Sequence, residues 1–268
     1  MNVCWNLTNV CNRDCIYCFR ELIEHARPLE DNMVILNKLY LSGVKSITYS
    51  GGEPFIYNGI LELMEYAKNL GITNRIITNG KMLTKENVKV YLKDVDKLTF
   101  SIDSPSDYVN ARCGCGKDHY KHIKEILPYI RESFPDLPIE INTVATNLNL
   151  QEVDFMFEAV GSELSFYGIK KWKILRFYPL RGYAKERQNF LNVPSSVFDA
   201  IKDKYDGKKA VFEISVRDHD SMEENLIVSP IGSLKKAEDA KEIVLVEDII
   251  STSSREIKKK MNLGGHHV

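Results

Sequence analysis

Short β-rich runs alternate with amphipathic segments along the first two thirds of the chain, and this alternation limits the folds open to it. The expected strands are residues 3–8, 46–49, 75–78, 97–101, 139–144 and 172–177. Between them, segments such as 58–70 and 120–130 carry apolar residues at helical spacing. Six strand–helix repeats predict an α/β fold with a parallel sheet and helical crossovers. The alternation alone leaves two closures, an open doubly wound sheet and a partial barrel.

Polar residues and glycines gather where the expected strands end. Residues 11–18, 51–54, 78–80, 101–103 and Asn142 all lie at or near the carboxyl end of a strand. In barrels and in open α/β sheets alike, this edge carries the active site. We therefore expect the functional residues to lie together there.

Three of the six cysteines, Cys11, Cys15 and Cys18, lie within eight residues after the first expected strand. Cysteine thiolates are the usual ligands of iron–sulfur clusters, and three of them leave one iron of a cubane open to a substrate or cofactor. The alternative is a structural zinc site completed by Cys4, Cys113 or Cys115, although such sites usually have two separated cysteine pairs. The loop by itself thus predicts a metal site with an open position.

The overall charge gives no sign of a general nucleic-acid or membrane-surface binder. The chain of 268 residues carries 36 basic and 37 acidic side chains, a net charge of −1. We see neither a signal-peptide pattern nor an apolar run of membrane-spanning length. We expect a cytoplasmic protein that binds neither nucleic acid nor membranes.

The cysteine spacing Cys-x3-Cys-x2-Cys, with the aromatic Tyr17 before the last cysteine, resembles the signature of the radical S-adenosylmethionine (SAM) superfamily. The run SGGEP at residues 50–54 resembles the motif with which that superfamily holds the SAM amino group. The resemblance implies a partial (β/α)6 TIM-like barrel over residues 1–180, with a C-terminal extension, 181–268, covering the barrel mouth. It also implies a [4Fe–4S] cluster that cleaves SAM to a 5′-deoxyadenosyl radical, which abstracts a hydrogen atom from the substrate.

The same resemblance implies which residues hold the cofactors. The cluster ligands would be Cys11, Cys15 and Cys18. The SAM contacts would be Tyr17, Gly51, Gly52, Glu53, Asn79, Ser101 and Asp103. Without the cysteine motif and the SGGEP run before them in the chain, Asn79 would indicate only a turn and Asp103 only a helix cap.

A basic stretch near the sixth expected strand is a candidate anion site. Five basic residues lie within twelve positions that contain no acid: Lys170, Lys171, Lys173, Arg176 and Arg181. In a strand, Lys171 and Lys173 share one face and can bind a polyphosphate together. A solvated basic edge strand is the alternative. The glycine-rich residues 112–117 form a second candidate anion site.

Together these pieces resemble the viperin-like branch of the superfamily over most of the chain, including residues 11–19, 47–55, 114–117, 141–144 and 171–173. That branch implies a lyase that dehydrates a ribonucleoside triphosphate to its 3′-deoxy-3′,4′-didehydro analogue, an antiviral chain terminator. The substrate-binding residues would be Lys117, His122, Asn142, Lys171, Lys173 and Arg176. An electron donor such as flavodoxin or ferredoxin is the expected partner of a monomer.

The chain also departs from viperins, which place an asparagine at Cys4 and a lysine at Ser46. No counterpart of their proposed proton-donating tyrosine is evident, so the general acid and the preferred base stay unassigned. A radical SAM maturase of a ribosomal peptide, or of another small substrate, is the alternative function. We expect a single cluster, because Cys113 and Cys115 lack the pattern of auxiliary-cluster ligands.

Overall fold

Seven parallel strands, adjacent in both sequence and space, form the centre of the fold. A computed structural model describes residues 1–20, 25–219, 226–238 and 241–264. The strands are β1 (Asn2–Thr8), β2 (Ser46–Gly51), β3 (Thr73–Thr78), β4 (Lys97–Ser101), β5 (Ile139–Ala145), β6 (Ile169–Arg176) and β7 (Glu213–Arg217). The six strands predicted from the sequence are confirmed, with ends that differ by at most three residues.

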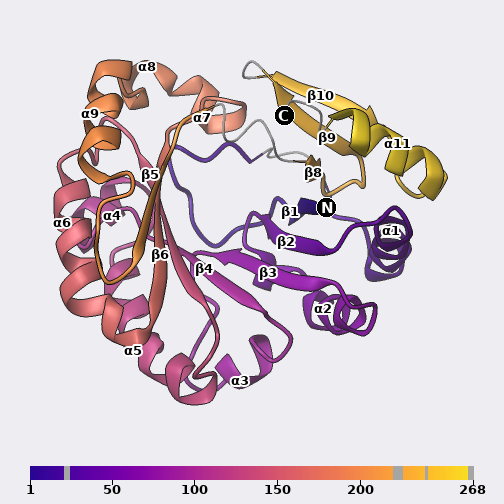
Figure 1. Cartoon of the computed structure of the whole chain (residues 1–268), viewed down its shortest axis with the longest axis horizontal. Helices are drawn as coiled ribbons and strands as arrows, with labels where there is room; N and C mark the ends of the chain where they lie inside the picture. The colour runs from indigo at the N-terminus through magenta and orange to yellow at the C-terminus, as the bar shows by residue number, and fades with distance from the viewer. Residues whose placement is uncertain (21–24, 220–225, 239–240, 265–268) are drawn as a thin grey trace.

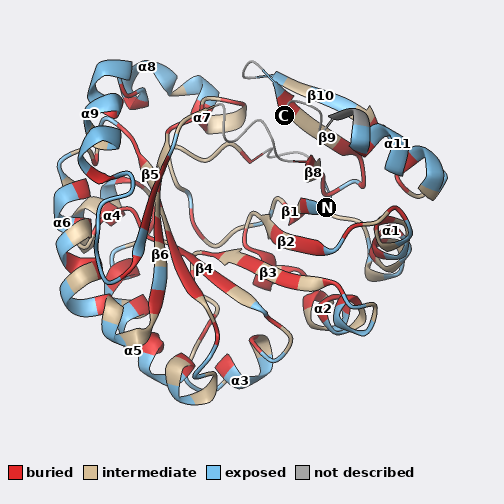
Figure 2. Ribbon diagram, in the orientation of Figure 1, coloured by how far each residue is buried: buried red, intermediate tan, exposed pale blue. Residues whose placement is uncertain are grey.

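Helices cover the outer face of the curved sheet (Figure 1). The main ones are α1 (Leu29–Leu41), α2 (Ile60–Asn69), α3 (Val88–Tyr91), α4 (Asp107–Arg112), α5 (His119–Ser133), α6 (Glu152–Ala159) and α9 (Ser195–Tyr205). Strand residues that face this layer are fully buried, among them Trp5, Ile47, Phe100 and Trp172. Buried and more exposed residues alternate along several strands, as Figure 2 shows. The main core therefore lies between sheet and helices, and the other strand face is left to line the interior.

The C-terminal part of the chain extends the same sheet at both edges. β7 pairs with β6, while β8 (Leu226–Val228) pairs with β1 and is followed by antiparallel β9 (Leu234–Glu238) and β10 (Lys241–Val246). Helix α11 (Ser254–Gly264) lies near α1. Within the described ranges the sheet begins at β10 and ends at β7, which gives a partial barrel rather than a closed one. The expected domain boundary at residue 180 stays a prediction.

No helix in the described ranges combines the length and the apolar composition that crossing a bilayer requires.

Candidate active site

The loop that carries the three cysteines follows β1 and lies directly against the end of β2. The Gly52 N–H donates to the Thr8 carbonyl, and the Glu53 N–H donates to the Val10 carbonyl at 2.9 Å. A Cβ at Gly52 would overlap the Val10 carbonyl oxygen, and one at Gly51, whose φ is +123°, would overlap that of Thr8. Glycine is needed at both positions because backbone meets backbone there. The two glycines thus allow the cysteine loop to lie directly against the end of β2.

Glu53 and Asn79 connect the ends of β2 and β3 to the cysteine loop. The Glu53 carboxylate is fully buried and accepts hydrogen bonds from the Thr78 hydroxyl at 2.7 Å and the Asn79 N–H at 2.9 Å. Burial raises the pKa of Glu53 to about 7, although these donors favour the ionised form. The Asn79 side-chain amide donates to the Asn12 side chain at 2.9 Å and to the Cys11 sulfur at 3.7 Å. Both predicted SAM residues therefore lie beside Cys11.

The donor set of the loop suits an iron–sulfur cluster. Cys11, Cys15 and Cys18 are free, partly exposed thiols. Burial raises the pKa of Cys18 to about 11, and a bound cation would favour its thiolate form. Within the described residues, no group of three His, Cys, Asp or Glu side chains lies close enough together to hold one metal ion. A cubane is held differently, because each thiolate binds a separate iron at a separate corner.

A buried arginine adds positive charge next to these thiols. The Arg20 residue is 8% exposed, its Nη2 atom donates to Asp14 at 3.0 Å, and its backbone N–H donates to the Cys18 sulfur at 3.5 Å. Its Nε and Nη1 atoms have no hydrogen-bond partner in the described part of the chain. A buried guanidinium with spare donors fits a site that holds an anionic group.

The glycine-rich loop at residues 112–117 packs against the cysteine loop. The Ile16 N–H donates to the Cys113 carbonyl at 3.0 Å, and a Cβ on Gly114 would overlap the Asp14 carbonyl. This packing brings the Cys115 sulfur to 3.6 Å from the Cys15 sulfur. The glycines of this second candidate anion site therefore serve the contact between two loops, and Lys117 lies exposed at its end.

Tyr17 and Asp103 meet at the centre of the site. The Tyr17 hydroxyl donates to one Asp103 carboxylate oxygen, and the Val144 N–H donates to the other at 2.8 Å. Asp103 is 2% exposed, and burial raises its pKa. The buried His119 ring lies with its Nε2 atom 2.7 Å from the Ser101 carbonyl oxygen, at the end of the same strand. The predicted SAM residues from β3 and β4 thus share one sheet edge with the cysteine loop.

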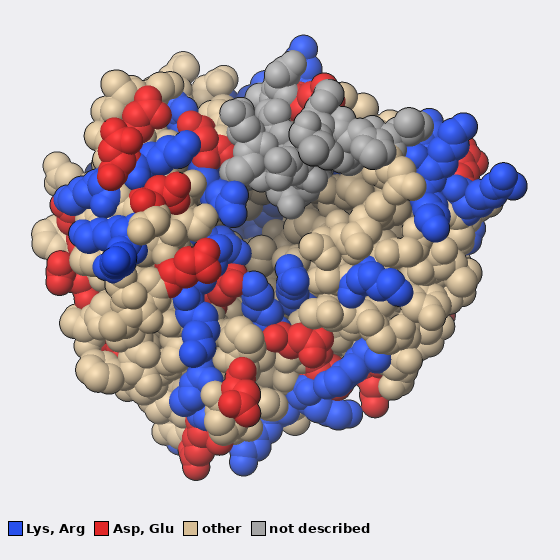
Figure 3. Space-filling view, in the orientation of Figure 1, with Lys and Arg blue, Asp and Glu red and all other residues tan. Residues whose placement is uncertain are grey.

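Lys171 and Lys173 lie on the inner face of β6. The opposite face is occupied by Trp172, whose ring packs at 5.8 Å on Tyr205 of α9. β6 lies between β5 and β7, so the edge-strand alternative for this segment is wrong. Asn142 lies in register with Lys173, and its Oδ1 atom is buried without a partner among the described residues. Figure 3 shows Lys and Arg side chains around a recess near the centre of the molecule.

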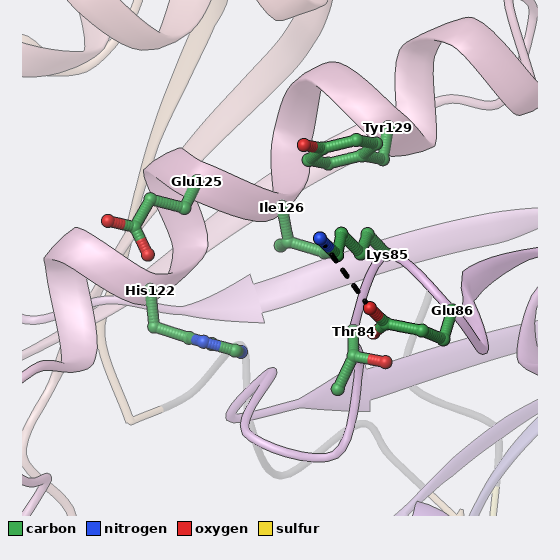
Figure 4. A pocket seen from close by; sticks show the side chains of 7 residues that line it. All are labelled: Thr84, Lys85, Glu86, His122, Glu125, Ile126 and Tyr129. Carbon is green, nitrogen blue, oxygen red and sulfur yellow. Dashed lines mark ion pairs between the residues drawn. The ribbon is translucent and has the colours of Figure 1, made fainter.

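Two of the predicted substrate residues lie elsewhere. Arg176 faces the outer layer, where it donates to the Val193 carbonyl at 2.8 Å and to Ser195 at the start of α9. The His122 ring lies 3.1 Å from the Gly80 carbonyl oxygen and lines a surface pocket beside α5 (Figure 4). The other residues lining that pocket are Thr84, Lys85, Glu86, Glu125, Ile126 and Tyr129. The structure therefore does not bring Arg176 and His122 together with Lys171 and Lys173.

Comparison with known proteins places this site in a family. The sequence profile of the Radical SAM superfamily matches residues 5–160, more than half of the chain. The chain belongs to the radical SAM superfamily. It is accordingly a radical SAM enzyme whose cofactors are a [4Fe–4S] cluster and SAM. Of the two metal sites left open by the cysteine spacing, the cluster is the one this family uses.

Several relatives bear the name S-adenosylmethionine-dependent nucleotide dehydratase. One from Selenomonas ruminantium is 30% identical over 230 residues, covering 82% of this chain and 78% of its own. One from Flammeovirga pacifica is 26% identical over 245 residues, covering 86% and 80%. One from Lacinutrix mariniflava is 28% identical over 198 residues and matches 68% of this chain, which spans only 39% of that relative.

Solved radical SAM structures share the fold. Streptococcus suis SuiB bound to SAM superposes with a TM-score of 0.68 at 18% identity, covering 87% of this chain and 59% of its own. Native anSMEcpe with bound SAM gives 0.69 at 15% identity, covering 100% and 84%. At these identities the likeness shows the barrel alone.

Sequence reasoning missed several residues of the site. Arg20 has no role in the sequence prediction, although it follows the cysteine motif by two positions, and Cys115 appears there only as a possible zinc ligand. Glu140 was also missed, although it shares the inward face of β5 with the predicted Asn142 by strand alternation. That alternation was the available signal for Glu140, whereas nothing local indicates that Cys115 contacts Cys15.

Proposed function

We propose that this radical SAM enzyme dehydrates a ribonucleotide to its 3′-deoxy-3′,4′-didehydro analogue, as a lyase that removes the 3′ hydroxyl as water. The sequence predicts a ribonucleoside triphosphate as the substrate. The observation that carries the proposal is the placement of Lys171 and Lys173 on the inner face of the barrel, below the edge that holds the cysteines. The proposal is supported by relatives named nucleotide dehydratase, which this chain matches over most of their length.

The depth of the interior suits a nucleotide laid along it. Val144 lies at the upper edge, bonded to Asp103, and Asn142 lies two residues deeper on the same face of β5. At the rise of a parallel strand, that step is about 7 Å. A ribose under the cysteine loop would therefore have its phosphates near Asn142 and Lys173, where the lysine ammonium can bind them.

The chain's own residues hold and order the reacting groups. When bound, the cluster and SAM supply the radical that abstracts the 4′ hydrogen. Cys11, Cys15 and Cys18 would hold the cluster, and Asn79 orients Cys11 through its amide. Tyr17, fixed by Asp103, would lie against the adenine of SAM and close that side to water. An electron donor such as flavodoxin or ferredoxin would reduce the cluster.

The test is an anaerobic incubation of reconstituted protein with SAM, a reductant and each of the four ribonucleotides, supplied separately as mono-, di- and triphosphates. We expect one base to stimulate release of 5′-deoxyadenosine and to yield a product lighter by one water. A Cys11→Ala variant serves as the control for cluster-dependent turnover. If no nucleotide stimulates SAM cleavage, the dehydratase proposal is wrong.

A further inference from the structure

A buried carboxylate joins two lysines inside the barrel. Glu140 lies on β5 with its side chain 7% exposed, and its two oxygens lie 2.5 Å from the Lys97 ammonium and 2.6 Å from that of Lys173. The two lysine side chains are 27% and 28% exposed, so they border the interior while Glu140 lies beneath them. Burial opposes ionisation, yet the lysines hold the pKa of Glu140 below its usual value. At neutral pH this is an ionised bridge.

Neighbouring charges on the same inner face complete a small network. Lys171 pairs with Glu213 at 2.5 Å. Arg75 on β3 lies in register with Lys97, and its Nε atom is buried without a partner among the described residues. Four cations against two carboxylates leave two positive charges. Two positive charges are enough to balance a single phosphate monoester, whose charge near neutral pH is about −1.5 to −2.

This network of charges lies at the depth that the outer phosphates of a nucleoside di- or triphosphate would reach. Glu140 is in register with Lys171, one inward-facing position below the Asn142–Lys173 pair. A first phosphate near Asn142 and Lys173 would be followed by others pointing at the Glu140 carboxylate. Each added phosphate brings at least one more negative charge. The added phosphate must either lie beside the Glu140 carboxylate or displace it from one of its two lysines, which leaves a buried carboxylate with a single cationic partner.

We propose that Glu140 is a specificity residue. It makes the barrel interior selective for a nucleotide with one phosphate and disfavours binding of the triphosphate. The inference rests on the proposed nucleotide function and narrows its substrate from the triphosphate predicted by the sequence. Glu140 acts by neutralising one of the two positive charges of Lys97 and Lys173, so that Lys173 can bind a first phosphate but the pair cannot also bind a terminal one. The net charge of +2 that the four cations keep against the two carboxylates is left to balance the single phosphate.

The experiment measures nucleotide binding by calorimetry to the anaerobically reconstituted enzyme with SAM, for the mono-, di- and triphosphate of each ribonucleoside. For the preferred base, we expect the wild-type enzyme to bind the monophosphate at least about tenfold more tightly than the triphosphate. The Glu140→Gln variant keeps the shape and removes the charge. It should move the ratio toward the triphosphate by about tenfold or more.

The matched control is Glu163→Gln, which removes a carboxylate paired with Lys124 on the outer surface and should leave the ratio unchanged. Tighter binding of the triphosphate by the wild-type enzyme overturns the inference, and this measurement does not require the Glu140 variant to fold. An unchanged ratio in a folded Glu140→Gln variant overturns it as well. With either of these two results, nucleotides still stimulate SAM cleavage, so the dehydratase proposal survives. If no nucleotide stimulates SAM cleavage, the dehydratase function is wrong and this inference falls with it.

Discussion

The Tyr17 hydroxyl donates a hydrogen bond to the Asp103 carboxylate and so joins the cysteine loop to the end of β4. The same hydroxyl lies 3.3 Å from the Cys115 sulfur, and the second Asp103 oxygen accepts the Val144 N–H. Residues from three other segments of the chain are therefore held around one buried carboxylate. Because that carboxylate is out of reach of water, its donors matter for stability.

Replacing Tyr17 by Phe removes the donor and keeps the ring. We expect the free energy of unfolding to fall by about 1–3 kcal/mol, since the buried Asp103 carboxylate then lacks a strong donor. Urea unfolding of the anaerobic protein measures this change. Tyr108→Phe is the control, because Tyr108 is 71% exposed and should change stability little. Equal effects of the two substitutions would show that the buried bond contributes nothing.

Substituting Gly52 by Ala should prevent cluster loading. The new Cβ overlaps the Val10 carbonyl oxygen, so the cysteine loop must move away from β2. We expect the iron content after reconstitution to fall several-fold. Gly161→Ala is the matched control, because its nearest neighbour, the ring of Phe212, would lie 3.8 Å away. Full iron loading of the Gly52 variant would show that close contact between the cysteine loop and β2 is not needed for cluster binding.

The cysteines should divide into ligands and supports. Serine at Cys11, Cys15 or Cys18 should abolish binding of the about four iron atoms of one cluster. Serine at Cys113 or Cys115 should preserve it, although Cys115 lies 3.6 Å from Cys15. Iron and sulfide analysis with the visible absorption spectrum measures the outcome. Iron loss in the Cys115 variant as complete as in the Cys15 variant would make Cys115 a ligand.

Acid should destabilise the protein partly through His119. Burial lowers the pKa of this histidine from 6.5 to about 4, so between these values the unfolded chain binds a proton that the folded chain does not. Stability is therefore present above pH 6.5 and is lost as the pH falls toward 4, by about 3 kcal/mol in total. The His119→Gln variant, which can keep the bond to the Ser101 carbonyl, should show a shallower pH dependence in urea unfolding between pH 7 and 4. Parallel curves for the two proteins would refute the assignment.

Lys173 should act on nucleotide binding rather than on SAM. We expect Lys173→Ala to raise the nucleotide KM by about tenfold while changing unstimulated SAM cleavage little, because an ammonium–phosphate contact is lost. Lys170→Ala, at an exposed position of the same strand, is the matched control. Equal losses in both reactions would argue against a phosphate role for Lys173.

Local features of the sequence predicted much of the fold and the cofactor end of the site. Strand and helix periodicity depend on neighbouring residues, so the six strands could be located within three residues of their ends. The cysteine spacing is likewise local: by itself it predicted a metal site with an open position, and the resemblance of residues 11–18 and 51–54 to the superfamily's motifs implied the cluster and SAM. The strands from Leu226 onward carried no such signal, because β8 pairs with β1 across more than 200 residues.

Contacts between distant segments were decided by the tertiary structure. The period of a strand predicted that Lys171 and Lys173 share a face, but only the register of β4, β5 and β6 shows that Glu140 bridges Lys173 to Lys97. The Cys15–Cys115 contact likewise depends on how two loops pack. Sequence by itself thus determined which residue types stand at the sheet edge, since that follows from local spacing. Tertiary structure decided which charges neutralise one another, since that follows from strand register.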